Sequence, residues 1–179
     1  MTVHKVMNEP KVLISETEIL KRVGVLAEQM NHDYKGQELT AICILKGGVI
    51  FFSDLIRKLK MPLRCEFLRL SSYGLQTESS GEIKMTLGLS EAIINKHVLV
   101  IEDIVDTGLS LNFTLDYLKL NQPASIKTAA LLFKPDALKT EKLTIDYVGF
   151  EIPNKFVVGY GLDYAEKYRE LPYIGVINP

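Results

Sequence analysis

The chain has 179 residues, of which 47% are hydrophobic and 24% are charged, values typical of one soluble globular domain. Its formal net charge of -1 excludes a general nucleic-acid or membrane-surface binder, because such proteins depend on an excess of basic residues. No apolar run approaches the roughly 18 residues that a spanning helix requires. Two cysteines, Cys43 and Cys65, and the absence of a secretory signal sequence predict a reducing, cytoplasmic location.

The first part of the chain predicts two helices and two strands. Capping-box spacing at Ser15 followed by apolar residues at helical intervals predicts a helix that begins there and ends at Gly36. The apolar run 39–45 predicts a strand, which stops at the Lys-Gly-Gly turn 46–48 before a second helix over 49–59. Apolar and charged residues then alternate over 63–67, which indicates a strand with one exposed face.

The second part of the chain continues this alternation. The polar, turn-prone stretch 71–80 predicts a long surface loop. The continuous apolar run 98–101 is typical of a strand that is buried on both faces, and a helix-like stretch follows the turn 106–110 and continues to residue 120. Further strands are predicted over 126–133 and 146–150. Strands that alternate with helices favour an α/β domain with a mostly parallel sheet, in which ligands bind beyond the carboxyl ends of the strands.

The end of the third predicted strand carries the residues most suited to chemistry. A helix N-terminus offers unpaired amides to a phosphate, Gly108 lets the backbone approach closely, and the hydroxyls of Thr107 and Ser110 add donors. The ionised carboxylates of Glu102 and Asp103 can accept hydrogen bonds from a sugar diol or hold a hydrated Mg²⁺. An isolated pair of acids at a strand end is more often structural, so the pair by itself leaves both interpretations open.

The full string VLVIEDIVDTGLSL, residues 98–111, resembles the phosphoribosyl-pyrophosphate signature of the type I phosphoribosyltransferases. The resemblance covers nearly the whole chain and is closest to the hypoxanthine (guanine) phosphoribosyltransferases. It implies a single domain over residues 1–179 with a mostly parallel central sheet flanked by helices, a small hood formed by the N- and C-terminal segments, and a flexible lid loop. The residues implied to bind the phosphoribosyl group are Glu102, Asp103, Asp106, Thr107, Gly108, Leu109 and Ser110.

Further segments support this resemblance at the pyrophosphate and lid positions. Lys46 and Gly47 match the family's pyrophosphate loop, in which the Leu-Lys peptide is often non-trans, and Arg169 matches its pyrophosphate-binding arginine. Ser72 and Tyr73 match the tip of the lid loop that closes over the reaction centre. Taken alone, the first segment is only a strand-to-helix turn and the second only a surface loop.

The purine-binding residues are also implied by the resemblance. Lys134 matches the lysine that donates to the purine O6, and Phe156 matches the ring that stacks on the base. The backbone of Val157 reads the edge of the purine, and Asp163 reaches toward the metal. Taken singly, Phe156 is more often a core residue and Asp163 a surface residue, but the four occur together in the expected order.

The implied reaction is purine salvage, in which hypoxanthine or guanine displaces pyrophosphate from phosphoribosyl pyrophosphate to give IMP or GMP. Asp106 matches the general base, which takes the proton from purine N7 while N9 attacks the sugar. The implied cofactor is Mg²⁺, with Glu102, Asp103 and Asp163 as direct or water-mediated partners. Family members are homodimers or homotetramers. The sequence does not decide between hypoxanthine, guanine and xanthine as the preferred base.

Other classes of phosphate-binding protein fit less well. The chain has no G-x-x-x-x-G-K-[ST] string, which excludes a P-loop hydrolase, and the G-x-G formed by Gly159 and Gly161 lacks the third glycine of a dinucleotide site. The histidines have no metal-ligand spacing. One alternative from another class is a transcriptional or RNA-binding regulator of the same fold that binds phosphoribosyl pyrophosphate as an effector. The near-zero net charge disfavours this alternative.

Overall fold

The structure, a computed structural model, describes residues 9–72, 83–140 and 143–178. Helices α1, α2 and α3 span Glu16–Asp33, Val49–Ile56 and Leu109–Leu120, and a 3-10 turn spans Pro135–Ala137. The strands are β1 (Lys11–Ile14), β2 (Leu39–Leu45), β3 (Leu63–Ser72), β4 (Ile83–Leu87), β5 (His97–Val105), β6 (Ser125–Phe133), β7 (Tyr147–Glu151), β8 (Val157–Val158) and β9 (Ile174–Val176).

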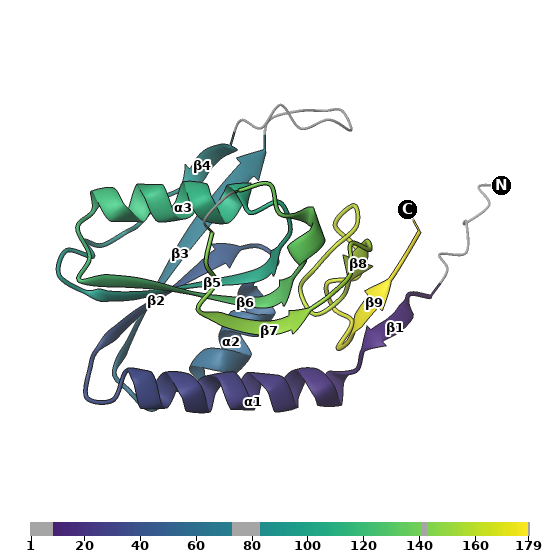
Figure 1. Cartoon of the computed structure of the whole chain (residues 1–179), viewed down its shortest axis with the longest axis horizontal. Helices are drawn as coiled ribbons and strands as arrows, with labels where there is room; N and C mark the ends of the chain where they lie inside the picture. The colour runs from purple at the N-terminus through teal and green to yellow at the C-terminus, as the bar shows by residue number, and fades with distance from the viewer. Residues whose placement is uncertain (1–8, 73–82, 141–142, 179) are drawn as a thin grey trace.

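The larger sheet has six strands in the order β4-β3-β2-β5-β6-β7 (Figure 1). Strands β3, β2, β5, β6 and β7 are parallel neighbours, and only the edge strand β4 is antiparallel. The predicted α/β fold with a mostly parallel sheet is therefore confirmed. Because the central strands run the same way, their carboxyl ends meet at one edge of the sheet, where ligands bind in this class of fold.

Helices cover both faces of this sheet, with α1 and α2 on one side and α3 on the other (Figure 1). Successive side chains of β2 point to opposite faces, so Cys43 packs in the cluster that contains Phe51 of α2, whereas Ile42 packs in the cluster that contains Leu111 of α3. Burial on both faces explains why β2 is a continuous apolar run.

A second, three-stranded sheet joins the two ends of the described chain. Strand β9 lies between β1 and β8 and is antiparallel to both. In Figure 1 this sheet lies at one end of the molecule, beside the carboxyl ends of the central strands. None of its strands was predicted, because strands of two to four residues are too short to show a periodic pattern.

Several predicted boundaries differ from the observed ones. Helix α1 begins at the predicted Ser15 cap, where both hydrogen bonds of the capping box are present, but α2 ends at Ile56 rather than at residue 59. Strand β5 continues to Val105, so Glu102 and Asp103 lie inside the strand and not beyond its end. The reason is that β6 continues to pair with β5 past the two acids.

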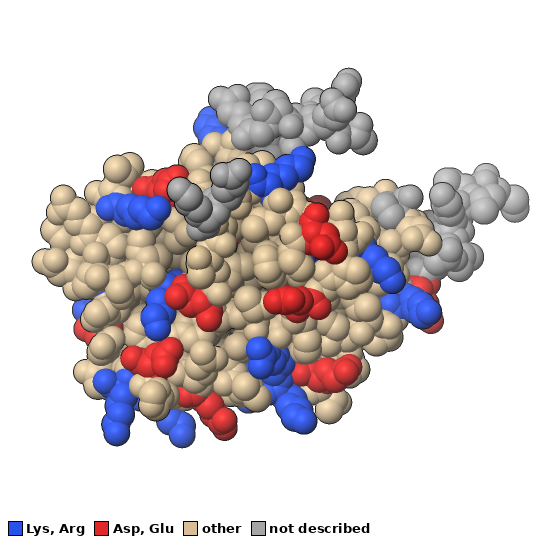
Figure 2. Space-filling view, in the orientation of Figure 1, with Lys and Arg blue, Asp and Glu red and all other residues tan. Residues whose placement is uncertain are grey.

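The predicted loop over 71–80 is partly wrong. Ser71 and Ser72 belong to β3, which pairs with the unpredicted strand β4, and residues 73–82 lie outside the described part of the chain. Among the described residues, no helix is long and apolar enough to cross a membrane. On the face shown in Figure 2, acidic and basic side chains are interspersed, in keeping with the net charge of -1.

Candidate active site

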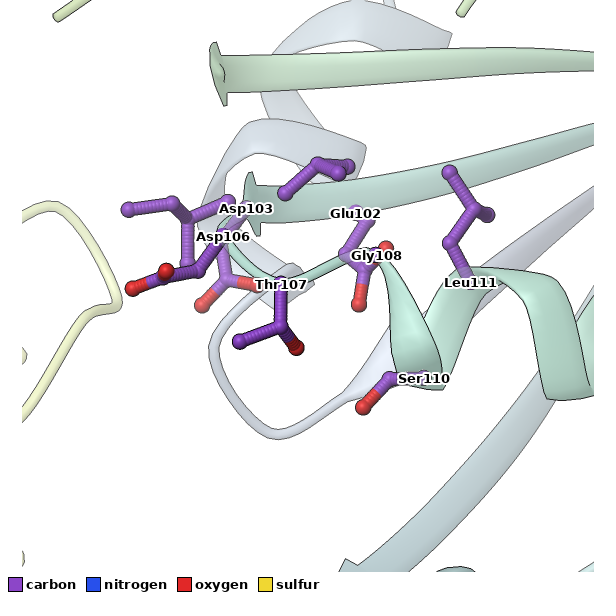
Figure 3. Close-up of a pocket in the computed structure, with 9 residues that line it drawn as sticks. Glu102, Asp103, Asp106, Thr107, Gly108, Ser110 and Leu111 are labelled. Carbon is purple, nitrogen blue, oxygen red and sulfur yellow. The ribbon is translucent and has the colours of Figure 1, made fainter. Parts of the chain in front are cut away.

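The candidate site lies at the edge where β2, β5 and β6 end. A cavity of about 260 Å³ opens around the connection from β5 to α3 (Figure 3). Its lining is one continuous stretch of chain with a single omission, and it contains most of the residues predicted to bind the phosphoribosyl group. The lining residues are Glu102, Asp103, Ile104, Val105, Asp106, Thr107, Gly108, Ser110 and Leu111.

The turn before α3 presents a helix N-terminus to this cavity. Gly108 is the N-cap residue and has a φ of 79°, a left-handed conformation that glycine adopts without strain. Gly108 provides no side-chain cap, and the Leu109 amide makes only a long hydrogen bond of 3.5 Å to Oγ1 of Thr107, so the start of the helix can offer amides to a ligand. Behind the turn, the Lys139 amide donates to the Thr107 carbonyl over 3.0 Å, which holds the turn against the segment after β6. These features suit a phosphate group.

A side chain at position 108 would have no room. A Cβ placed on Gly108 would lie 2.3 Å from Oγ1 of Thr140 and 2.8 Å from methyl groups of Leu138 and Leu143. The turn therefore needs glycine both for its conformation and for the close approach of the neighbouring segment. Leu109, also predicted to bind the phosphoribosyl group, is the first residue of α3 and does not line the cavity.

The two acids of β5 differ in their surroundings. Glu102 is 7% exposed, and its Oε2 atom is buried without a hydrogen-bond partner among the described residues. Burial, reinforced by the charge of Asp103, raises the pKa of Glu102 well above its ordinary value. Burial also raises the pKa of Asp103 to about 6, against the opposing effects of two backbone amides and of Arg169. A ligand that brings positive charge or hydrogen-bond donors would stabilise the ionised form of both acids.

The raised pKa of Asp103 predicts a pH-dependent stability. The folded pKa of about 6 exceeds the ordinary value of 3.8, so between these values the folded chain binds more protons than the unfolded chain and loses stability as pH rises. We expect Asp103→Asn to stabilise the protein without ligand by up to about 3 kcal/mol at pH values above the pKa of Asp103 in the folded chain. At pH values below the pKa of Asp103 in the unfolded chain, the substitution should give no gain. Urea unfolding at the two pH extremes measures this difference, and equal gains at both would contradict the assignment.

Asp106 and Lys134 form an ion pair at the mouth of the cavity. Nζ of Lys134 lies 2.8 Å from Oδ2 of Asp106. The Lys134 side chain is 7% exposed whereas that of Asp106 is 44% exposed, so the lysine is the buried partner. The Lys134 amide donates to the Val105 carbonyl over 2.9 Å, which extends the pairing of β6 with β5 and fixes the position of the lysine. The structure thus brings together the predicted general base and the predicted purine donor.

The predicted pyrophosphate loop follows β2 and packs closely against the other parts of the site. The Leu45-Lys46 peptide is cis. A Cβ placed on Gly47 would lie 1.6 Å from Oδ2 of Asp103, and one placed on Gly161 would lie 2.1 Å from the carbonyl oxygen of Gly47. Glycine at both positions lets three separate chain segments meet at one point.

Arg169 lies among acidic and carbonyl oxygens at the same edge. Its guanidinium donates to Oδ1 of Asp163 over 2.8 Å and to the Gly161 carbonyl over 2.8 Å. Its Nε atom is buried and has no partner among the described residues. Arg169 therefore keeps one buried donor that no described residue satisfies.

The predicted purine stretch lies at the small sheet, and none of its residues lines the cavity after β5. Phe156 is 43% exposed, and its ring meets that of Tyr164 edge to face with 5.5 Å between centroids. Val157 is buried in β8. Of the predicted lid residues, Ser72 is the last residue of β3, and Tyr73 lies outside the described part of the chain.

Two contacts at the site were missed by the sequence analysis. Glu166 forms an ion pair with Lys46, 120 residues away in the chain, with 2.8 Å between Oε2 and Nζ. The hydroxyl of Tyr160 donates to Oδ2 of Asp54 on α2 over 2.5 Å. Neither contact has a sequence signature, because each joins residues that only the fold brings together.

Comparison with known proteins agrees with this geometry. The profile of the phosphoribosyl transferase domain matches residues 14–165. The hypoxanthine-guanine phosphoribosyltransferase of Bacillus subtilis is 46% identical over 169 residues, which cover 94% of this chain and 93% of that protein. The bifunctional protein TilS/HprT of Listeria monocytogenes is 44% identical over 169 residues, and this chain spans only 26% of its length. A crystal structure of a hypoxanthine-guanine phosphoribosyltransferase from Bacillus anthracis has a TM-score of 0.90 at 44% identity, and the match covers 95% of this chain and 100% of that one.

A mostly parallel sheet with a glycine turn and a helix N-terminus after its central strand, together with the matching profile, defines a phosphoribosyltransferase of type I fold. The similar proteins show which family of phosphoribosyltransferases the chain belongs to. The chain belongs to the hypoxanthine-guanine phosphoribosyltransferase family, whose members are enzymes of purine salvage. The relatives named here carry the names of enzymes, so the alternative of a regulator is not supported.

Proposed function

We propose that the chain transfers the phosphoribosyl group of phosphoribosyl pyrophosphate to hypoxanthine or guanine, giving IMP or GMP and pyrophosphate. The observation that carries this proposal is the ion pair between Asp106 and Lys134. Asp106 comes just before the N-terminus of α3, which is suited to bind phosphate. A carboxylate that can accept a proton and a buried cation that can bind a carbonyl oxygen are the two groups that a 6-oxopurine requires.

The phosphoribosyl group would occupy the cavity after β5. Its 5'-phosphate would bind the amides and hydroxyls of the turn formed by Thr107, Gly108, Leu109 and Ser110. The ribose hydroxyls would donate to Glu102 and Asp103. The buried Oε2 atom of Glu102, which has no partner among the described residues, supports this assignment. Pyrophosphate would bind at Lys46 and Gly47, and Arg169 would add the Nε donor that has no partner among the described residues.

The purine would lie between Phe156 and the ion pair. The exposed Phe156 ring supplies a face for stacking, while the backbone of Val157 and the carboxylate of Asp163 would read the edge of the base. Lys134 would donate to O6. Lys134 pairs with Asp106 in the structure, so a hydrogen bond from Lys134 to O6 would compete with this pair and leave the carboxylate free.

The mechanism follows from the charges at the site. Loss of pyrophosphate gives the sugar the character of an oxocarbenium ion and leaves a highly charged leaving group. The backbone amides at Lys46 and the side chain of Arg169 would stabilise the charge on the leaving group, and the acids of β5 would hold the ribose in place. Asp106 would accept the N7 proton as N9 attacks, which keeps the purine from developing positive charge.

The residues at the site fit a magnesium ion. Mg²⁺ prefers oxygen ligands and usually keeps several waters together with one or two carboxylates and substrate phosphates. No group of three His, Cys, Asp or Glu side chains among the described residues could hold a metal, so a full protein cage is not formed there. The raised pKa of Asp103 and the unpartnered oxygen of Glu102 fit a bound cation, and Asp163 is the third candidate. When bound, the ion would neutralise negative charge on pyrophosphate.

Replacement of Lys134 should weaken purine binding. We expect Lys134→Met to lower the affinity for hypoxanthine by about 1 to 3 kcal/mol, because the buried O6 acceptor loses its donor. The exposed Lys139, five residues further on, provides the matched control Lys139→Met. Isothermal titration calorimetry with hypoxanthine measures the effect, and equal affinity in the two variants would remove Lys134 from the site.

Steady-state turnover tests the proposed function. The assay supplies phosphoribosyl pyrophosphate and Mg²⁺ with hypoxanthine, guanine or xanthine in turn, and adenine serves as the negative control. Formation of IMP or GMP is the expected result and also establishes the base preference. Turnover of adenine alone, or of no purine, would refute the proposal. A parallel filter-binding assay with RNA or DNA would detect the regulator alternative.

The remaining expectations about organisation belong to this proposal. We infer one phosphoribosyltransferase domain over residues 1–179, in which the sheet of β1, β8 and β9 is the hood and the segment with Ser72 and Tyr73 is the lid. The cytoplasm, where purine salvage takes place, is the expected location. Deletion of β1 should abolish purine binding if the hood interpretation is right.

We also infer that the protein is a homodimer or homotetramer. Val49 of α2 is 39% exposed and Phe67 of β3 is 37% exposed, and the ring of Phe67 lies 5.6 Å from that of Phe52. An apolar surface shared by a helix and a neighbouring strand supports contact with a second copy of the chain. Sedimentation of the purified protein as a monomer at micromolar concentration would contradict this inference.

A further inference from the structure

A buried tyrosine joins the chain segment that carries Arg169 to helix α2. Tyr160 is 4% exposed and lies in the stretch between β8 and β9 that Figure 1 draws in yellow-green. Its hydroxyl donates to Oδ2 of Asp54 over 2.5 Å, and the other carboxylate oxygen of Asp54 accepts from Arg57. Burial and the hydrogen bond to Asp54 raise the pKa of Tyr160, so the hydroxyl keeps its proton and remains the donor.

The backbone at Tyr160 is strained, and hydrogen bonds hold the residue from two sides. Its φ is 50°, a left-handed conformation that is rare for a bulky residue. The Tyr160 amide donates to the Leu171 carbonyl over 2.8 Å, while the hydroxyl at the other end of the residue is held by Asp54. Backbone strain that the surrounding contacts maintain is typical of functional sites, and it points here to a constraint on the position of this turn.

The turn at Tyr160 is connected to both parts of the proposed pyrophosphate site. The Gly161 amide donates to the Arg169 carbonyl over 3.0 Å, and the Arg169 guanidinium donates to the Gly161 carbonyl over 2.8 Å. Gly161 also packs against Gly47, whose carbonyl oxygen would lie 2.1 Å from a Cβ at position 161. Asp54, which accepts from Tyr160, belongs to α2, the helix that begins two residues after Gly47.

We propose that Tyr160 is a positioning residue of the pyrophosphate site. Its hydrogen bond to Asp54 sets the place of Arg169 relative to the backbone amides of the loop after β2. This inference rests on the proposed function, which assigns those amides and Arg169 to the leaving group. An anion that binds both groups needs each of them at hydrogen-bond distance, so a small displacement of one group weakens binding. Tyr160 therefore acts through Arg169 and does not itself need to touch the substrate.

Replacement of Tyr160 by phenylalanine tests the inference, because phenylalanine keeps the ring and removes only the hydroxyl. We expect Tyr160→Phe to raise the KM for phosphoribosyl pyrophosphate and the inhibition constant of inorganic pyrophosphate by roughly 3- to 30-fold, below the about 100-fold that a full ångström of misplacement can cost. The KM for hypoxanthine should change little, since backbone hydrogen bonds to other elements hold Lys134 and Phe156. A merely structural role would reduce the amount of folded enzyme, and with it the apparent kcat, but neither KM.

Tyr147→Phe is the matched control. Tyr147 is 2% exposed, and its hydroxyl donates to Oδ2 of Asp33 over 2.7 Å, so this substitution removes a buried hydrogen bond of the same kind. Tyr147 is the first residue of β7, which is parallel to β6, so it lies at the edge of the sheet opposite the site. Urea denaturation should show similar losses of stability for the two variants, whereas only Tyr160→Phe should raise the KM for phosphoribosyl pyrophosphate.

Two changes at Asp54 test the other partner of the hydrogen bond. Asp54→Asn keeps an acceptor oxygen and should retain the wild-type KM for phosphoribosyl pyrophosphate. Asp54→Ala removes the acceptor and should reproduce Tyr160→Phe, which also covers the case in which Tyr160→Phe folds poorly. Equal KM values in the Tyr160 and Tyr147 variants, or a wild-type value in Asp54→Ala, would overturn the inference, while turnover by the wild type would leave the proposed function intact. Absence of turnover in the wild type would refute the proposed function itself.

Discussion

Asp106→Asn should lower kcat by roughly 10²- to 10⁴-fold, the range expected for loss of a positioned general base. Asparagine keeps the shape of the side chain but cannot accept the N7 proton. The KM for phosphoribosyl pyrophosphate should change little, because the phosphate turn begins one residue later and relies on backbone amides. Steady-state kinetics with hypoxanthine measures both constants.

The control for this variant must separate chemistry from stability. Asp106 neutralises the buried Lys134, and removal of one partner of a buried ion pair can destabilise the folded chain. Asp116→Asn on α3 removes an exposed carboxylate that pairs with Lys119 over 3.0 Å, and it should leave kcat unchanged. If Asp106→Asn turns over at the wild-type rate, Asp106 is not the base. If its loss of activity follows only from unfolding, urea denaturation will reveal this.

The sequence predicted those parts of the fold in which burial imposes a pattern. Strand β2 was predicted with its observed ends, because it is buried on both faces. Helix α3 was predicted with its observed end at Leu120, but it begins at Leu109, inside the predicted turn. Strand β4 was missed, since its residues alternate only weakly in exposure and it follows a polar segment. Strands β1, β8 and β9 form a sheet between distant parts of the chain, and no local pattern encodes such pairing.

Some residues of the candidate site were predicted from their chemistry, others only from the family resemblance, and others not at all. A phosphate site at the turn before α3 is predicted from chemistry, because a glycine, two hydroxyls and a helix N-terminus occur within a few residues, and it stays a prediction. The meeting of Lys134 with Asp106 depended on resemblance to a family, since 28 residues separate the two in the chain. The Glu166–Lys46 pair could be predicted from neither source. Exposed charges carry no burial pattern, and only the folded chain brings the two side chains together.

Gly161→Ala should be among the most damaging single substitutions in the chain. Gly161 has a φ of 101°, which alanine adopts only with strain, and the added Cβ would lie 2.1 Å from the carbonyl oxygen of Gly47. The obstacle is backbone and cannot rotate away as a side chain would. We expect a loss of roughly 2 to 5 kcal/mol of unfolding free energy from strain and overpacking together. Urea denaturation measures this loss.

The same substitution should also damage pyrophosphate binding. Relief of the clash requires the loop of Lys46 and Gly47 to move away from Gly161, whose own carbonyl accepts from Arg169. The KM for phosphoribosyl pyrophosphate should therefore rise in whatever fraction remains folded. Gly24→Ala in α1 is the contrasting control, since a Cβ there meets no atom within 4 Å and should stabilise the helix by about 0.5 to 1 kcal/mol. Similar effects of the two substitutions would mean that the close packing of Gly161 on Gly47 does not constrain the site.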